Sequence, residues 1–139
     1  AEKMMLLPQT TSSCVSPFVQ RAGVEAIVGA QSEIESMMTT YSRRRDLLVE
    51  GLNSIPGLTC TSPKGAFYAF ADIRSFGTSS SEFASRVLEE HGVALLPGSD
   101  FGPNGEGFIR LSFASSENRI QDAIRRLRDF CRGLQTNDS

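Results

Sequence analysis

The chain has 139 residues, 40% of them hydrophobic and 22% charged, which is long enough for one domain with its own core. Its 14 basic and 16 acidic residues argue against a nucleic-acid or anionic-membrane binder driven by bulk charge. No apolar run approaches the ~20 residues of a membrane span. Three dispersed cysteines, Cys14, Cys60 and Cys131, form no C-x-x-C motif and favour a cytoplasmic protein over a disulfide framework.

Two helices are predicted in the first part of the chain. The first should follow Ser16–Pro17, an N-cap residue and a proline at the first helical position, and should end at Gly29. The second begins with a capping box at Ser32–Glu35, and its apolar stripe continues to Ile55. It would be roughly 36 Å long at 1.5 Å per residue. The arginines at 43–45 interrupt the stripe, so we expect this helix to link two bodies.

Strands and helices alternate in the rest of the chain. The helix that starts at Ser79 should bury Phe83, Val87 and Leu88, and the backbone should turn tightly at Gly65. This order predicts an α+β fold, in which helices cover one face of a small antiparallel or mixed sheet and the long linking helix precedes it. The predicted elements are strands 58–61, 66–71, 93–96 and 108–113 and helices 79–92 and 116–134.

Arg110 is the most informative residue for function. Strand alternation places it on one face and its apolar neighbours Ile109 and Leu111 on the other. A cation within a hydrophobic strand is costly unless it meets an anion, and a guanidinium binds a carboxylate through two parallel bonds. The pattern therefore suggests a site for a small acidic ligand. An edge-strand arginine that reaches water, or one paired with a core aspartate, is the alternative.

The other conspicuous residues are interpreted as structural. His91 should close a helix, where a cation is favourable beside the helix dipole. The glycine-rich run Gly98–Gly107 lacks a phosphate-binding pattern and should be an irregular connection. Phe67, Tyr68 and Phe70 are expected in the core. The residues alone predict no catalytic, cofactor-binding or metal-binding side chain.

The chain also carries five longer segments in a characteristic order: Ser16–Ala26, Arg43–Leu52, Pro63–Phe70, Val93–Ser99 and Ile109–Ala114. Taken together, these segments resemble the class I/II aminotransferases, which are pyridoxal-phosphate enzymes of the aspartate aminotransferase type with fold type I. The resemblance extends from about residue 8 to residue 134.

The resemblance implies a domain division and a role for several residues. Residues 1–30 would be a remnant of the large cofactor-binding domain, and residues 31–139 would be the C-terminal small domain. Arg110 matches the family's arginine for the substrate α-carboxylate. Phe67 matches an aromatic residue that lines the substrate pocket, and Gly65 matches the turn beside it. The implied substrates are an amino acid and a 2-oxo acid, and the implied full-length enzyme is a homodimer.

The chain departs from the family in its lysines. The family's chemistry needs a lysine that bonds covalently to pyridoxal phosphate, whereas Lys3 and Lys64, the two lysines present, lie in no such context. We therefore expect the C-terminal part of an enzyme whose large domain is missing here. Pyridoxal phosphate would belong to the full-length enzyme, and this chain alone would be inactive. The alternative is a stand-alone, non-catalytic α+β module that binds small carboxylates or mediates dimerisation.

Overall fold

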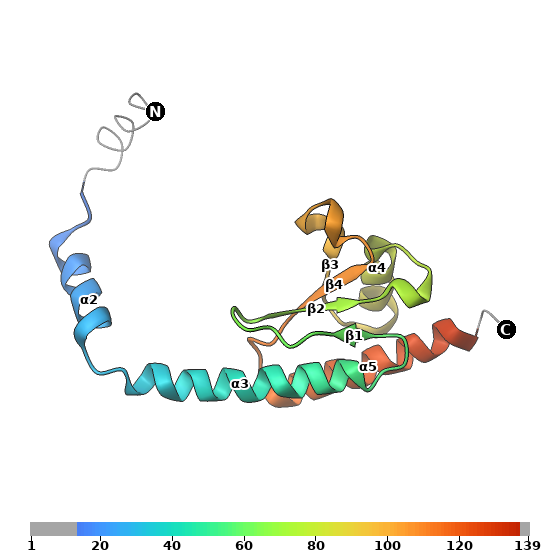
Figure 1. Ribbon diagram of the computed structural model, residues 1–139, viewed down its shortest axis with the longest axis horizontal. Coiled ribbons are helices and arrows are strands. Elements are labelled where there is room, and N and C mark those ends of the chain that lie inside the picture. The colour runs from blue at the N-terminus through green and yellow to red at the C-terminus, as the bar shows by residue number, and fades with distance from the viewer. Residues whose placement is uncertain (1–13, 137–139) are drawn as a thin grey trace, which may run out of the picture. The chain divides into compact units, whose positions relative to one another are not determined.

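A computed structural model describes residues 14–136 (Figure 1). The chain divides into two compact units, residues 1–36 and 37–139, and the boundary falls within α3 (Ser32–Asn53). The 22 residues of α3 confirm the single long helix expected from the sequence. Leu48 and Leu52 on its C-terminal half are buried, whereas Met37 is half exposed. Only the later part of its apolar stripe therefore belongs to the core.

The first unit contains α2 (Pro17–Val28), which begins after Ser16 and ends at Gly29, as predicted. The Gly29 backbone N–H donates to the Glu25 carbonyl at 2.8 Å and closes the helix. None of the α2 side chains is buried, and Phe18 and Ile27 are 77% and 80% exposed. The described part of the chain therefore leaves the apolar residues of this helix uncovered.

The second unit is built on a four-stranded antiparallel sheet with the order β1-β2-β4-β3. Ala69 pairs with Leu111 and Ala71 pairs with Ile109 across β2 and β4, and all four side chains are buried. Since strand side chains alternate, the residues between them lie on the opposite face. The strands are β1 (Thr59–Cys60), β2 (Tyr68–Asp72), β3 (Leu96–Pro97) and β4 (Phe108–Ser112).

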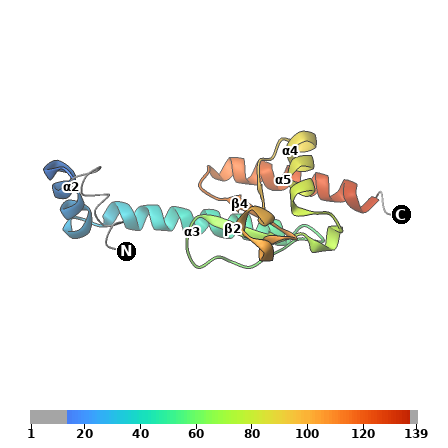
Figure 2. The same ribbon diagram turned by 90° about the horizontal axis from the view of Figure 1, so that it is seen from above.

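The buried face of the sheet packs against the C-terminal part of α3, α4 (Ser80–His91) and α5 (Glu117–Thr136). Figures 1 and 2 show this part of α3 and α5 running side by side, and the Arg43 Nε–H donates to Glu117 at 2.6 Å between them. This arrangement confirms the α+β prediction. The largest buried core side chains include Leu52, Ile55, Ile73, Phe83, Val87, Ile109, Phe113, Leu127 and Cys131.

Both ends of α4 lie where the sequence predicted them, but one of the residues predicted to be buried on this helix is exposed. The Ser79 hydroxyl accepts the Glu82 backbone N–H, and Gly92 adopts a left-handed conformation at the C-terminus. Phe83 is buried as predicted, whereas Leu88 is 53% exposed, so the prediction for Leu88 was wrong. At about 100° per residue, Leu88 lies about 140° around the helix from Phe83 and therefore leaves the buried stripe.

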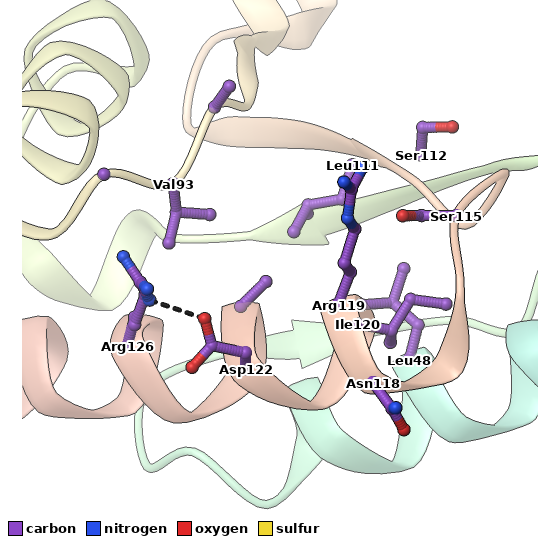
Figure 3. A pocket seen from close by; sticks show the side chains of 13 residues that line it. Leu48, Val93, Leu111, Ser112, Ser115, Asn118, Arg119, Ile120, Asp122 and Arg126 are labelled. Atoms are coloured by element: carbon purple, nitrogen blue, oxygen red, sulfur yellow. Dashed lines mark hydrogen bonds and ion pairs between the residues drawn. The ribbon is translucent and has the colours of Figure 1, made fainter.

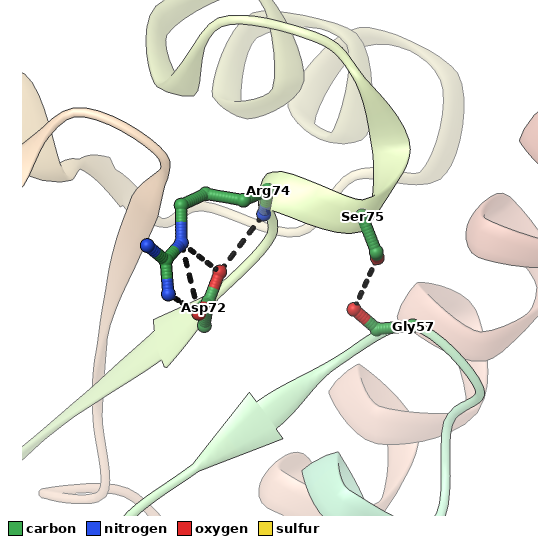
Figure 4. A network of polar contacts seen from close by, with 4 residues as sticks. All are labelled: Gly57, Asp72, Arg74 and Ser75. Carbon is green, nitrogen blue, oxygen red and sulfur yellow. Dashed lines mark hydrogen bonds and ion pairs between the residues drawn. The ribbon is translucent and has the colours of Figure 1, made fainter.

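Two short links hold the turns at the end of the sheet. The Arg74 guanidinium and backbone N–H donate to the Asp72 carboxylate, and the Ser75 hydroxyl donates to the Gly57 carbonyl at 2.6 Å (Figure 4). Hydrogen bonds from Arg74 lower the pKa of the Asp72 carboxyl. The turn after β2 is thereby tied to the turn before β1.

Within residues 14–136, no helix has both the length and the apolar composition to cross a membrane.

A polar cluster around the buried Ser80 anchors the glycine-rich connection to the start of α4. Ser80, which is fully buried, donates its backbone N–H and its hydroxyl to the two carboxylate oxygens of Glu106 at 2.8 and 2.9 Å. The Ser99 backbone N–H donates to the Ser80 hydroxyl at 3.4 Å. A carboxylate at a helix N-terminus is also favoured by the helix dipole. The cluster therefore holds the short helical turn η2 (Gly98–Phe101) against α4.

We predict that this cluster makes folding stability depend on pH. Hydrogen bonds from Ser80 lower the pKa of Glu106 from its ordinary value of 4.5. The stabilisation is therefore present above that value and is lost as the pH falls through the lowered pKa of the folded state. Glu106→Gln should reduce the free energy of unfolding at about pH 7 and have a smaller effect at about pH 3.5, measured by urea denaturation.

Glu89→Gln, which removes an exposed carboxylate from α4, is the control and should change stability little at either pH. An equal loss for Glu106→Gln at both pH values would contradict the proposed ionic role of Glu106.

Candidate functional site

The structure places Arg110 in the middle of β4, with the side-chain alternation predicted from the sequence. Ile109, Leu111 and Phe113 are buried beneath the sheet, whereas Arg110 is half-buried on the other face. β4 lies between β2 and β3, so Arg110 is not on an edge strand. This position contradicts the alternative of an edge arginine that simply reaches water.

The guanidinium of Arg110 contacts aromatic rings instead of an acid. Its Cζ lies 4.2 Å from the centroid of the Tyr68 ring and 4.0 Å from that of Phe101. Among residues 14–136, no side chain forms an ion pair or hydrogen bond with the Arg110 guanidinium. The described chain therefore supplies no core aspartate for it. Since cation–π contacts use none of the N–H donors, the guanidinium keeps its donors available for a bound anion.

Arg74 on the same sheet face provides a useful contrast. Its Cζ lies 5.3 Å from the centroid of the Phe108 ring, but its guanidinium also donates to both oxygens of Asp72 (Figure 4). Arg74 thus has an aromatic neighbour and a carboxylate from the chain itself. Arg110 has the aromatic neighbours without the carboxylate.

Arg110 borders a small cavity of about 160 Å³. Tyr68 and Ser112 line it on β2 and β4, and Leu96 on β3 is the cross-strand neighbour of Arg110. Ala94 and Leu95 complete its wall. A charge and a hydroxyl therefore face a mostly apolar hollow. This arrangement can hold the charged end of a small acid through the guanidinium while its apolar part contacts the wall.

Gly65 and Phe67 line a different cavity, of about 440 Å³, between α3 and the loop that precedes β2. Met37, Met38 and Tyr41 of α3 form the opposite wall. Tyr68 is next to residues of both cavities, because its ring centroid lies 4.4 Å from that of Phe67 and the ring also contacts Arg110. The structure thus brings Gly65 and Phe67 together at one cavity, whereas Arg110 lines a second cavity.

The turn beside this cavity differs from the prediction in detail. The left-handed residue is Ala66, with φ of 59°, and not Gly65. A Cβ added to Gly65 would meet no atom within 4 Å in the described chain. A positive φ at a residue other than glycine is uncommon and costs energy. The predicted tight turn is therefore present, but it is centred one residue later, at Ala66.

The expectation that the three aromatic residues of this region belong to the core was wrong, because none of them joins the buried core of the sheet. Phe67 is 42% exposed and Phe70 is 38% exposed, while Tyr68 is half-buried. In β2 the small residues Ala69 and Ala71 occupy the buried positions, which places Tyr68 and Phe70 on the open face with Arg110.

A further cavity among the described residues, of about 620 Å³, does not contain Arg110. It lies between α5 and the segment after α4, and Figure 3 shows Arg119 extending from α5 towards β4. The Arg126 guanidinium in this cavity already donates to Asp122 at 2.7 Å and to the His91 carbonyl at 3.2 Å. Much of its polar lining is therefore paired within the chain.

The buried cysteines are unsuited to nucleophilic chemistry. Cys60 and Cys131 are free thiols within the core, and burial raises the pKa of both, to about 12 for Cys131. The thiolate is the reactive form, so these residues act as core side chains.

His91 ends α4, as predicted, and its ring packs edge-on against Phe130 at 5.6 Å between centroids.

Sequence reasoning did not identify Tyr68 and Phe101 as neighbours of Arg110. Alternation within residues 68–72 would have placed Tyr68 on the same face as Arg110 if the pairing of β2 with β4 had been known. No local signal could have found Phe101, because the short turn η2 brings it to Arg110 from nine residues earlier in the chain.

Comparison with known proteins agrees with this geometry. The family described as Aminotransferase class I and II matches residues 4–127. The chain is 39% identical over 121 residues to the aspartate aminotransferase of Pyrococcus horikoshii, covering 86% of this chain and 31% of that protein. It resembles the crystal structure of the aromatic aminotransferase from Pyrococcus horikoshii OT3, with a TM-score of 0.89 and 34% identity, covering 96% of this chain and 36% of that one.

The crystal structure of the aspartate aminotransferase from Rhizobium meliloti is also similar, with a TM-score of 0.85 and 34% identity, covering 94% of this chain and 34% of that one. The chain spans about a third of the length of the curated relatives that it matches. Because the family match covers most of the sequence and the fold agrees, the chain belongs to the class I and II aminotransferase family.

Proposed function

We propose that this chain is the C-terminal small domain of a pyridoxal-phosphate-dependent aminotransferase, in which Arg110 binds the substrate α-carboxylate. The observation that carries the proposal is a half-buried guanidinium on an interior strand, beside a cavity, with no acid partner among residues 14–136. In the proposed reaction one amino acid becomes its 2-oxo acid, and a second 2-oxo acid receives the amino group and becomes an amino acid.

Arg110 would contribute binding and orientation. Its planar guanidinium can donate two parallel hydrogen bonds to a carboxylate, which fixes the direction of the substrate as well as its charge. Orientation of this kind accelerates a reaction only when the reacting groups are also held in place. Phe67 and Gly65, beside the neighbouring cavity, are proposed to line the substrate pocket.

We propose that the residues described do not form a cofactor site by themselves. Lys64, the one lysine within residues 14–136, is exposed on the loop between β1 and β2, and the glycine-rich connection uses its Glu106 and Ser99 groups to hold Ser80. We therefore propose that pyridoxal phosphate is bound by parts of the enzyme outside these residues. The proposed role of this chain in the reaction is to bind the substrate.

The remaining partners are proposed on the same basis. Residues 1–30 would belong to the large domain, and the exposed apolar residues of α2, such as Phe18 and Ile27, would be covered by it. The full-length enzyme is proposed to be a cytoplasmic homodimer. The named relatives act on different amino acids, so the donor is proposed only as an amino acid with a free α-carboxylate.

The test compares the 139-residue chain with the complete protein that carries it. With pyridoxal phosphate, an amino-acid donor and 2-oxoglutarate, the chain alone should form no glutamate, whereas the complete protein should form it. Glutamate production by the chain alone would overturn the proposal that the cofactor site lies in other parts of the enzyme. A complete protein that folds, binds pyridoxal phosphate and transfers no amino group from any tested donor would overturn the function.

One observation favours a second candidate, a carboxylate-binding module without catalysis. Residues 37–139 form a compact unit with its own core, and this unit contains Arg110. The distinguishing measurement is titration of the 139-residue chain with maleate, followed by NMR. Saturable shifts around Arg110, together with a complete protein that lacks transferase activity, would select this candidate.

A further inference from the structure

The environment of Arg110 contains two aromatic rings that arrive from different elements. Tyr68 belongs to β2, which is paired with β4, and Phe101 belongs to η2, which follows β3. Their centroids lie 4.2 and 4.0 Å from the Arg110 Cζ. Both distances are well within the roughly 6 Å over which a guanidinium is attracted to an aromatic face.

We propose that Tyr68 and Phe101 are positioning residues, which hold the Arg110 guanidinium in place before the substrate carboxylate arrives. This inference rests on the proposed function, because it deepens the role given to Arg110. A free arginine side chain loses rotational freedom when it binds an anion, and contacts that order it beforehand reduce that loss. The rings leave the N–H donors unused, so they order the guanidinium without competing with the ligand.

Phe101 is held in this position independently of Arg110. The Gly102 backbone N–H donates to the Ser99 carbonyl at 3.3 Å and closes η2. Ser99 in turn donates to the buried Ser80, which donates to Glu106. The Phe101 ring also makes an edge-to-face contact with the Phe70 ring, with centroids 6.2 Å apart. The fold therefore presents the ring to Arg110 without help from a ligand.

The kinetic test uses the holoenzyme that contains this chain. Phe101→Leu and Tyr68→Leu remove a ring while keeping an apolar side chain. Each should raise the KM for the amino-acid substrate about three- to tenfold, with kcat changed less than twofold. Phe101→Tyr and Tyr68→Phe keep a ring and should retain the original KM. A general structural defect would not be rescued by the presence of a ring.

Phe108→Leu is the matched control. Its ring lies on the same sheet face but contacts Arg74, so its removal should leave the KM unchanged. If Phe101→Leu and Tyr68→Leu behave like Phe108→Leu while Arg110→Gln still raises the KM, the positioning role is wrong and the proposed function stands. If Arg110→Gln itself leaves the KM unchanged, the proposed function fails.

A spectroscopic measurement on the 139-residue chain tests the same contacts without activity. The Arg110 side-chain Nε–H resonance, assigned by its loss in Arg110→Gln, should show a ring-current shift that decreases in Phe101→Leu and in Tyr68→Leu. It should persist in Phe108→Leu. An Arg110 resonance that is identical in all of these variants would show that the rings do not hold the guanidinium, and would overturn the inference.

Discussion

Arg110→Gln in the complete enzyme is expected to lower kcat/KM for its amino-acid substrate by about 10²- to 10³-fold. A hydrogen bond to a charged group contributes about 1.5–3 kcal/mol, and the bidentate arrangement loses both bonds and the charge at once. Arg110→Lys keeps the positive charge but cannot donate two parallel hydrogen bonds to one carboxylate, so its decrease in kcat/KM should be intermediate. Steady-state kinetics with a varied amino donor would measure both changes.

The control for this prediction is Arg74→Gln. Arg74 lies on the same face of the sheet and beside an aromatic ring, but its Nε–H and Nη2–H groups already donate to the Asp72 carboxylate. Its substitution should leave kcat/KM within about twofold of the original value, since this guanidinium already has a carboxylate partner in the chain. Equal kinetics for Arg110→Gln and the unmodified enzyme would remove Arg110 from substrate binding.

Gly98→Ala is expected to reduce the free energy of unfolding by about 3 kcal/mol. A Cβ at Gly98 would lie 2.1 Å from the Gly105 carbonyl oxygen and 2.7 Å from that of Phe108. Both obstacles are backbone atoms, so no side-chain rotation can relieve the overlap. The substitution must displace the connection that carries Phe101 to Arg110, and urea denaturation of the 139-residue chain would measure the cost.

Gly133→Ala is the matched control for this substitution. A Cβ at Gly133 meets no atom of the described residues within 4 Å, its own helix backbone aside, and the residue lies within α5, where alanine is favoured over glycine by roughly 0.5–1 kcal/mol. This variant should therefore be slightly more stable than the original chain. If Gly98→Ala unfolded at the same urea concentration as the original, the close backbone approach would not exist in solution.

The helices show what local sequence can determine. Pro17 and Gly29 bound α2, the Ser79 hydroxyl caps α4, and Gly92 ends it, because caps and stops act within one helical turn of the residues that form them. The alternation of buried and exposed side chains along β4 was also predicted correctly from the sequence, since Ile109 is fully buried and Arg110 is not. The buried face of α4 was predicted incorrectly at one position, because Leu88 was expected to be buried and is 53% exposed.

The surroundings of Arg110 could not be obtained in this way. Local patterns were sufficient to predict the helices, the α+β class and one unusual cation in a hydrophobic strand. The folded chain was needed to see that β4 lies between β2 and β3, that Tyr68 and Phe101 contact Arg110, and that Ala66 is the left-handed residue of the turn before β2. Helix ends and strand alternation arise from neighbouring residues, whereas strand order and ring contacts depend on pairings between distant parts of the chain, which no local pattern encodes.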